Sequence, residues 1–210
     1  MRKVIWVAVM LVILFSLAVT VHAAEAPTKD TQALYEEYAQ IIFEANETYG
    51  LNLTLLPYDQ IEDFCSVEEF ASTIDDYCRL RSVEFSSMPQ SNIHSTGARG
   101  VGVVTVPNVK TKTYEDDTIT ITFYGTFEVR QDLNGTYYIA SKSFVTYTAS
   151  TNGNIHFVAE GTPTTRVIHG GRTTVVTQNF RAYIRGTATD LVPVSANYYM
   201  SPATGNISAI

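Results

Sequence analysis

Beyond residue 23, the side chains best suited to proton transfer near neutral pH are three histidines, His94, His156 and His169. Each could act as a general base if a carboxylate and a nucleophile lay close to it. The densest acidic cluster in the same half of the chain is Glu-Asp-Asp at residues 115–117. Its spacing matches no metal-binding or acid–base motif, so ordinary surface residues are the simpler interpretation. A small secreted hydrolase with a histidine and a carboxylate is therefore the alternative hypothesis, and we assign no catalytic residue, cofactor site or metal ligand.

Three glycine-containing segments match ligand-binding loops only in part. Residues 97–102 precede a predicted strand, whereas a dinucleotide-binding loop follows a strand and opens a helix. Residues 131–135 would place Arg130 and Ser141 where a calcium loop has its first and last carboxylates. The glycines after His169 could belong to an oxyanion loop, but the chain has no Gly-x-Ser-x-Gly elbow. We interpret the three segments as a flexible entry to the sheet, a hairpin turn and a tight turn.

Cys65 and Cys78 are the only cysteines. An even count in an exported chain favours a disulfide, but Ser66 and Glu69 form a capping box that starts a helix directly after Cys65. A continuous helix between them would hold the two α-carbons about 20 Å apart, and a disulfide tolerates roughly 7 Å. Two free thiols are therefore favoured, unless the helix breaks. Cys65 is a weak candidate nucleophile, because its apolar neighbour Phe64 and the acidic segment around it disfavour a thiolate.

Hydroxyl and aromatic side chains are concentrated in the second half of the chain. Residues 118–126 place four threonines and Tyr124 in one row, and a later strand places Arg181, Tyr183 and Arg185 on one face. Such surfaces suit the binding of a sugar or a protein. Thr and Tyr are also good strand formers on a solvated face, so the pattern permits a binding surface without requiring one.

The first 23 residues have the pattern of a secretory signal peptide. Arg2 and Lys3 form a basic start, residues 4–21 are apolar apart from Ser16 and Thr20, and Val-His-Ala at residues 21–23 fits a signal peptidase site. Such an apolar stretch also approaches the length of a membrane-spanning helix, but the small-residue site favours cleavage after Ala23. We expect a secreted or extracytoplasmic protein that does not contact the membrane after cleavage.

Charge is unevenly distributed along the chain, whose formal net charge is −7. Residues 24–90 hold 14 acidic and 3 basic residues, a net charge of −11, whereas residues 91–210 hold 7 acidic and 9 basic residues, a net charge of +2. We divide the chain into the signal peptide (1–23), an acidic helical region (24–90) and an antiparallel β domain (91–210), of which the last two could share one core. The asymmetry marks either different partners for the two regions or simply solvated helix faces.

The same charge distribution limits the partners. The acidic region repels phosphates, and no basic stripe with interleaved aromatic residues is present, so we exclude nucleic acid. An anionic ligand should meet the β domain, because the acidic helical region repels it, unless the helices wrap around the sheet.

Two amphipathic helices are predicted in the acidic region. Apolar residues recur at helical spacing from residue 31, and Gly50 is a natural stop. The capped segment 67–80 repeats the pattern, with Phe70 and Ile74 on its apolar face. Residues 51–56 are predicted to be a short extended piece, 57–64 a helical turn and 82–99 the main loop. Both helices need a surface on which to bury their apolar sides.

After this loop the hydrophobic period changes from 3.6 to 2. Strands are predicted at residues 101–106, 118–130, 137–148, 155–159, 167–169, 173–185, 192–200 and 207–210. Their short connections favour antiparallel pairing. The predicted fold is therefore α+β, with two N-terminal amphipathic helices followed by a C-terminal antiparallel β-meander curled as a sandwich or an open barrel. The predicted core residues are Phe70, Ile74, Ile121, Phe123, Phe127, Val129, Phe180 and Ile184.

The hairpin formed by residues 118–130 and 137–148 has two possible registers. A three-residue turn pairs Val129 with Ile139 and keeps one face apolar, whereas a two-residue turn places Lys142 opposite Phe127. We expect the first register along the whole hairpin, because burial of one face strongly specifies the pairing.

These residues identify no family, and most catalytic signatures are absent. The function that we expect is non-catalytic. The protein would bind an envelope polymer or another protein through its β domain, or serve a structural role, at the cell envelope or outside the cell. The oligomeric state is left open.

Overall fold

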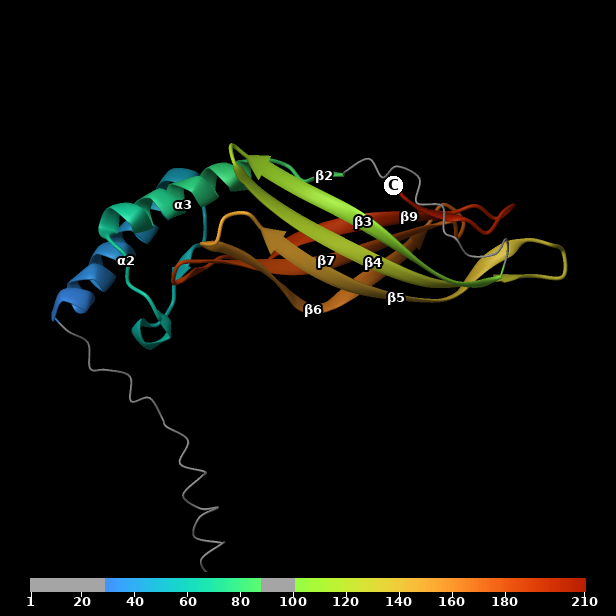
Figure 1. Ribbon diagram of the computed structural model, residues 1–210, viewed down its shortest axis with the longest axis horizontal. Helices are drawn as coiled ribbons and strands as arrows, with labels where there is room; N and C mark the ends of the chain where they lie inside the picture. The colour runs from blue at the N-terminus through green and yellow to red at the C-terminus, as the bar shows by residue number, and fades with distance from the viewer. Residues whose placement is uncertain (1–28, 88–100) are drawn as a thin grey trace, which may run out of the picture. The chain divides into compact units, whose positions relative to one another are not determined.

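The structure is a computed structural model that describes residues 29–87 and 101–210 (Figure 1). The predicted signal peptide, His94 and most of the predicted main loop lie outside the described residues. Residues Leu34–Ile210 belong to one compact unit, and the fold is described for that unit.

Two long helices precede all the long strands, as predicted. Helix α2 (Lys29–Tyr49) ends where Gly50 adopts a φ of 62°, a conformation that favours glycine. Helix α3 (Val67–Ser82) begins at the predicted cap, where the Ser66 hydroxyl accepts a hydrogen bond from the Glu69 N–H at 3.2 Å. Between the helices lie the short strand β1 (Thr54–Leu55) and a single 3₁₀ turn, η1 (Tyr58–Gln60). Among the described residues, no helix combines the length and apolarity needed to cross a membrane.

The remaining strands form two antiparallel sheets, which establishes an α+β fold with a β-rich C-terminal part. One sheet has the order β2-β3-β4-β5, and the other has the order β1-β8-β7-β9-β10 with β6 also paired to β7. The strand bounds are β2 (Ser86–Ser87), β3 (Gly102–Tyr114), β4 (Asp117–Gln131), β5 (Tyr137–Ser150), β6 (Ile155–Ile168), β7 (Thr173–Ile184), β8 (Thr187–Ala188), β9 (Val192–Met200) and β10 (Ile207–Ala209).

The strand predictions were right in position and incomplete in extent. Strand β3 continues to Tyr114, eight residues beyond the predicted end. The two strands predicted on either side of Pro163 form one strand, β6, whose register shifts between Glu160 and Thr164. The two-residue strands β2 and β8 were missed, because two residues are too short to show a period. The predicted meander is interrupted between β5 and β6, where the chain passes from one sheet to the other.

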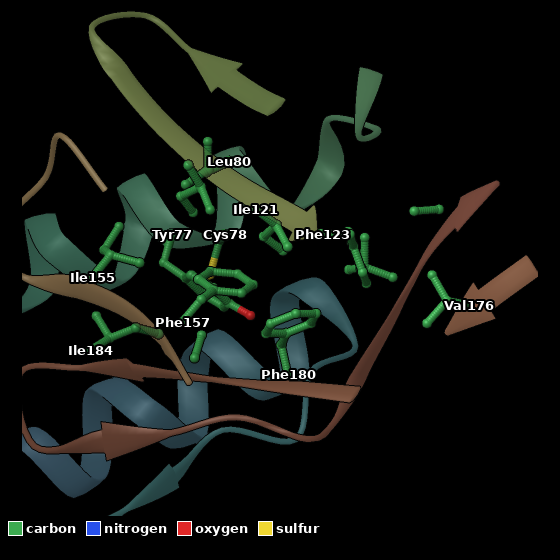
Figure 2. Packing of buried hydrophobic residues seen from close by; sticks show 14 of the residues in the cluster. Tyr77, Cys78, Leu80, Ile121, Phe123, Ile155, Phe157, Val176, Phe180 and Ile184 are labelled. Carbon is green, nitrogen blue, oxygen red and sulfur yellow. The ribbon is translucent and has the colours of Figure 1, made fainter. Parts of the chain in front are cut away.

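All eight predicted core side chains are buried, with at most 4% of any of them exposed. They belong to one hydrophobic cluster that includes residues of the helices and of both sheets, part of which Figure 2 shows. The rings of Phe123 on β4 and Phe180 on β7 pack edge to face with centroids 6.3 Å apart. The Tyr198 hydroxyl of β9 donates to the Phe123 carbonyl at 2.8 Å. The inner faces of the two sheets therefore meet each other, and α3 covers part of the same core.

The predicted register of the β4–β5 hairpin is correct for only three pairs. Val129 lies opposite Ile139, but a β-bulge next to it shifts the pairing, so that Phe127 lies opposite Lys142 and Gly125 opposite Phe144. Beyond the bulge, the hairpin follows the register that we had rejected. Strand β5 is the last strand of its sheet, so the inward-facing Lys142 stays half-buried. Its ammonium group can therefore remain hydrated, and the second register does not carry the cost of burying a charge.

Candidate functional site

The predicted acid–base residues are not brought together. His156 lies on β6, His169 lies in the β6–β7 turn, and the acidic cluster spans the β3–β4 turn and the first residue of β4. None of the hydrogen bonds in the described part of the chain joins a histidine to a carboxylate, and no group of three or more His, Cys, Asp or Glu side chains there could hold a metal ion. Asp117 instead accepts a hydrogen bond from the Asn152 amide at 2.8 Å, which ties two turns together.

His169 and its glycines form a turn, as predicted. His169, Gly170 and Gly171 all have positive φ angles, of 51°, 63° and 89°. The His169 Nδ1 atom lies 3.3 Å from the Thr173 hydroxyl, which is a contact within the turn itself. The segment therefore reverses the chain between β6 and β7.

Residues 131–135, which match a calcium loop in part, also form a turn. The Asp132 carboxylate accepts hydrogen bonds from the N–H groups of Asn134 and Thr136 at 2.9 and 2.8 Å. This carboxylate is thus occupied by its own backbone, and Gly135 supplies the positive φ angle of 82° that the turn requires.

The polar rows predicted as a possible binding surface are satisfied internally only in part. Thr105 and Thr126 share a hydroxyl hydrogen bond of 2.9 Å across β3 and β4, and Thr113 and Thr118 share one of 3.0 Å. On the later strand, Arg181 pairs with Glu160 through two hydrogen bonds of 2.6 and 3.3 Å. A surface whose polar groups already bind one another offers less to a ligand.

His156 lines a pocket of about 420 Å³ next to the 3₁₀ turn. Glu62, Asp63 and Tyr183 line the same pocket, and so does Arg185, which donates to Asn154 at 2.7 Å and pairs with Glu69 at 2.6 Å. None of the described residues lining this pocket is a Ser, Thr or Cys that could act as a nucleophile.

Cys65 and Cys78 are both free thiols, as predicted from the continuous helix between them. The Tyr38 hydroxyl donates to the Cys65 carbonyl at 2.7 Å and accepts from the Cys65 N–H at 2.9 Å, and it lies 3.3 Å from the thiol. Burial raises the pKa of Tyr38, so its proton stays in place to make these bonds. This arrangement fixes the chain before α3 and supplies no general base to Cys65.

Cys78 provides a test of the core through pH. Burial, with a smaller contribution from Asp75, raises the pKa of the Cys78 thiol from 9.0 to about 11. The unfolded chain therefore loses this proton first, and between pH 9 and 11 the folded state binds more protons. We expect the free energy of unfolding to fall as pH rises through that window, measured by urea unfolding at several pH values. The Cys78→Ala variant should show a shallower decline, and an unchanged slope would contradict burial of this thiol.

A cavity with uncompensated positive charge lies at the far end of β5 from the β5–β6 turn. It has a volume of about 560 Å³, and we call it the β5 pocket. One wall is the chain from residue 136 to 142, and another is the β6–β7 turn with Val167 and Thr174. Its charged lining residues, Lys142 and Arg172, are both cationic, and no described carboxylate lines it.

These two cations differ from most basic residues of the β domain. Arg130, Arg181 and Arg185 form ion pairs with Glu128, Glu160 and Glu69. The ammonium groups of two further lysines, Lys110 and Lys112, donate to the Ser87 hydroxyl and the Arg81 carbonyl. In the described part of the chain, the side chains of Lys142, Arg166 and Arg172 make no hydrogen bond or ion pair, and two of these three line one pocket.

The local structure explains why these side chains meet. The bulge in the β4–β5 pairing turns Lys142 to the inner side of its sheet, opposite Phe127. The two positive-φ glycines at the β6–β7 turn reverse the chain and place Arg172 directly before β7. Sequence analysis missed this site because the two cations lie thirty positions apart. The sequence feature that could have indicated the site is the low number of acidic residues, since residues 136–172 contain one acidic and three basic residues.

Thr174 adds a second unusual feature to the β5 pocket. Its side chain lines the pocket and is only 1% exposed, yet its hydroxyl has no hydrogen-bond partner among the described residues. A buried hydroxyl without a partner is costly and uncommon in native proteins. The hydroxyl itself has almost no accessible surface, so a ligand in the pocket would reach it only if neighbouring side chains moved.

No family model, no curated protein and no solved structure matches this chain. The functional argument therefore depends on the geometry and charge of the chain itself.

Proposed function

We propose that this protein is an exported, non-catalytic binding module whose β5 pocket holds an anionic ligand, either an envelope polymer or a protein. The observation that carries the proposal is the pair of unpartnered cations, Lys142 and Arg172, in one pocket without a described carboxylate. A cation beside a carboxylate or phosphate forms charge-assisted hydrogen bonds, each of which contributes about 1.5–3 kcal/mol. We also propose that the two sheets form a sandwich, with the β5 pocket at the open end between β5 and the β6–β7 turn.

The charge distribution supports the same assignment. The acidic helical region, with its net charge of −11, repels an anionic ligand, whereas the β domain is weakly cationic. Both effects act over about a Debye length, ~8 Å at physiological salt. Binding should therefore be sensitive to salt. Nucleic acid is a poor candidate ligand, because its many phosphates would also meet the acidic helices.

The binding proposal is tested by removing the two cations. We expect the double variant Lys142→Gln/Arg172→Gln to bind anionic oligomers at least ten-fold more weakly than the unmodified protein at low salt. The probes are fluorescently labelled polyphosphate, oligouronate and polyglutamate, and the measurement is fluorescence anisotropy over a range of salt concentrations.

Arg166→Gln is the control, because Arg166 is exposed and, like Lys142 and Arg172, unpartnered in the described part of the chain, but does not line the pocket. We expect it to change the affinity by less than about two-fold, since an isolated surface charge contributes little. Equal losses in the control and the double variant would show that only general charge matters. Absence of binding to every oligomer would refute the proposed function.

Export is proposed from the sequence alone and needs a direct test. The N-terminus of the protein recovered outside the cytoplasm should begin at Ala24 if cleavage follows Ala23. Recovery of the chain with its first residues intact would contradict the proposal.

A small secreted hydrolase is the second candidate function. The observation in its favour is that His156 shares its pocket with Glu62 and Asp63, which could orient it. Cleavage of cell-wall polymers or secreted proteins by the unmodified protein, but not by His156→Ala, would favour this candidate.

A further inference from the structure

Strand β5 is the only described terminal strand of either sheet that is long and contains no Gly or Pro. The other terminal strands, β1, β2 and β10, have two, two and three residues. Strand β6 is long, but Gly161 with a φ of 71°, Pro163 and a register shift interrupt it. Short strands, bulges and prolines protect a sheet edge from pairing with another chain. Strand β5 has 14 residues with no Gly or Pro, and its protection is limited to one bulge and the inward-facing Lys142.

Part of this edge is free. Strand β5 is paired only with β4, and its last residues lie near β6, where the Thr148 hydroxyl donates to the Phe157 carbonyl at 2.6 Å. At the other end, the Tyr137 N–H donates to the Pro202 carbonyl at 3.0 Å. Between these contacts, residues 138–146 have no described backbone partner besides β4. Their remaining N–H and C=O groups are available to a further strand.

The β5 pocket runs along this free edge. Seven consecutive residues, 136–142, line it. Because successive side chains of a strand point to opposite faces, a pocket that touches all seven must follow the strand edge itself. At about 3.3 Å per residue, this wall is roughly 20 Å long. A ligand in the pocket is therefore positioned to meet the backbone of β5.

The side chains along the edge of β5 favour a ligand whose own side chains alternate between two chemical types. On the inner side lie Lys142 and, across the pocket, Arg172, both cations without described partners. On the outer side, Tyr138 and Val145 are 45% and 53% exposed. A strand added to β5 would place its own side chains alternately beside these two sets. Acidic residues fit the inner side, and β-branched or aromatic residues fit the outer side.

We propose that the ligand of the β5 pocket is an extended peptide segment that adds to the free edge of β5 and alternates acidic residues with β-branched or aromatic ones. This inference rests on the proposed function, because it names the ligand class of the same pocket. Backbone hydrogen bonds to β5 hold the segment, and its carboxylates pair with Lys142 and Arg172.

A second copy of this chain fits the edge less well. Pairing of β5 with β5 would bring no carboxylate to Lys142, because residues 137–150 contain no Asp or Glu. Like charges close together disfavour such a pairing.

The test uses a library of ten-residue peptides with Glu fixed at three alternating positions and Val, Thr or Tyr between them. We expect selected peptides to bind the purified protein and to slow hydrogen exchange of backbone amides within residues 138–146. The best peptide is then made in two forms, N-methylated at the odd or at the even residues. An added strand uses one of its two edges, so one form should bind within about three-fold of the parent and the other at least ten-fold more weakly.

Each outcome decides the inference. Equal effects of the two methylated forms, or failure to select any peptide, would overturn it. If polyphosphate or oligouronate still binds through Lys142 and Arg172, the proposed function survives without the peptide ligand. If no anion binds, the proposed function fails as well. Slow exchange of the same amides without peptide, with a mass that rises with protein concentration, would identify a second copy as the occupant.

Discussion

Replacing Phe123 with Ala is expected to lower the free energy of unfolding by about 3–5 kcal/mol. Phe123 is fully buried in the cluster that joins both sheets to α3, and its ring packs against that of Phe180 at 6.3 Å (Figure 2). Removing the ring leaves a cavity that the opposing sheet can fill only in part. Urea unfolding followed by circular dichroism measures the change.

Phe43→Ala is the matched control for this experiment. Phe43 lies on α2 and is 60% exposed, so its ring contributes little to the core. We expect a change below about 0.5 kcal/mol, as is usual for surface substitutions. A similarly small effect at Phe123 would mean that the wrong face of β4 had been placed in the core.

The burial of Phe123 could be predicted because the signal is local and strong. Residues 118–130 alternate apolar and polar side chains over a whole strand, and only one face of such a strand can be buried. Helix α3 was equally predictable, since its cap at Ser66 and the spacing of Phe70 and Ile74 agree with each other. In both segments the local signals (propensity, capping and hydrophobic pattern) agree on the secondary structure and on the buried face, and tertiary packing does not override them.

The pairing of the two sheets could not be predicted in the same way. The choice of partner for each strand depends on contacts between residues far apart in the chain, which a period of two does not encode. Strand β5 illustrates this limit. The sequence shows the two possible registers. It does not show that a bulge separates them, with the first register at Val129 and beyond and the second from Glu128 back along the strand.

The β5 pocket depends on that bulge and was therefore hidden. In the predicted register, Lys142 would not lie opposite Phe127, and its side chain would not face the inner side of the sheet. The histidines and the threonine row drew attention because their chemistry is visible in the sequence. In the structure, His156 and His169 lie apart, and two threonines of the row, Thr118 and Thr126, pair with hydroxyl groups of β3. Charge without a partner is a property of the folded arrangement, so only the structure could distinguish Lys142 and Arg172 from the other basic residues.

Gly125 explains why the shifted register is stable, and it provides the second prediction with a large effect. A β-carbon at this position would lie 2.6 Å from the Phe127 ring and 3.0 Å from the Phe144 ring. Those two rings pack edge to face at 5.6 Å, and both contact Tyr198, so moving either ring would disturb this aromatic cluster. Phe144 lies directly opposite Gly125, and its ring occupies the space that a side chain at residue 125 would fill.

We therefore expect Gly125→Val to lower the free energy of unfolding by about 3 kcal/mol, near the upper end of the usual cost of overpacking. Because the displaced rings belong to the strands that carry Lys142 and the bulge, the variant should also weaken binding in the β5 pocket under conditions where it remains folded. Urea unfolding and anisotropy with the anionic oligomers measure the two effects. Gly153→Val is the control, since Gly153 has open space around it and no positive φ. If Gly125→Val were as stable as this control, Phe127 and Phe144 could not be packed as described, and the register beyond the bulge would have to be reassigned.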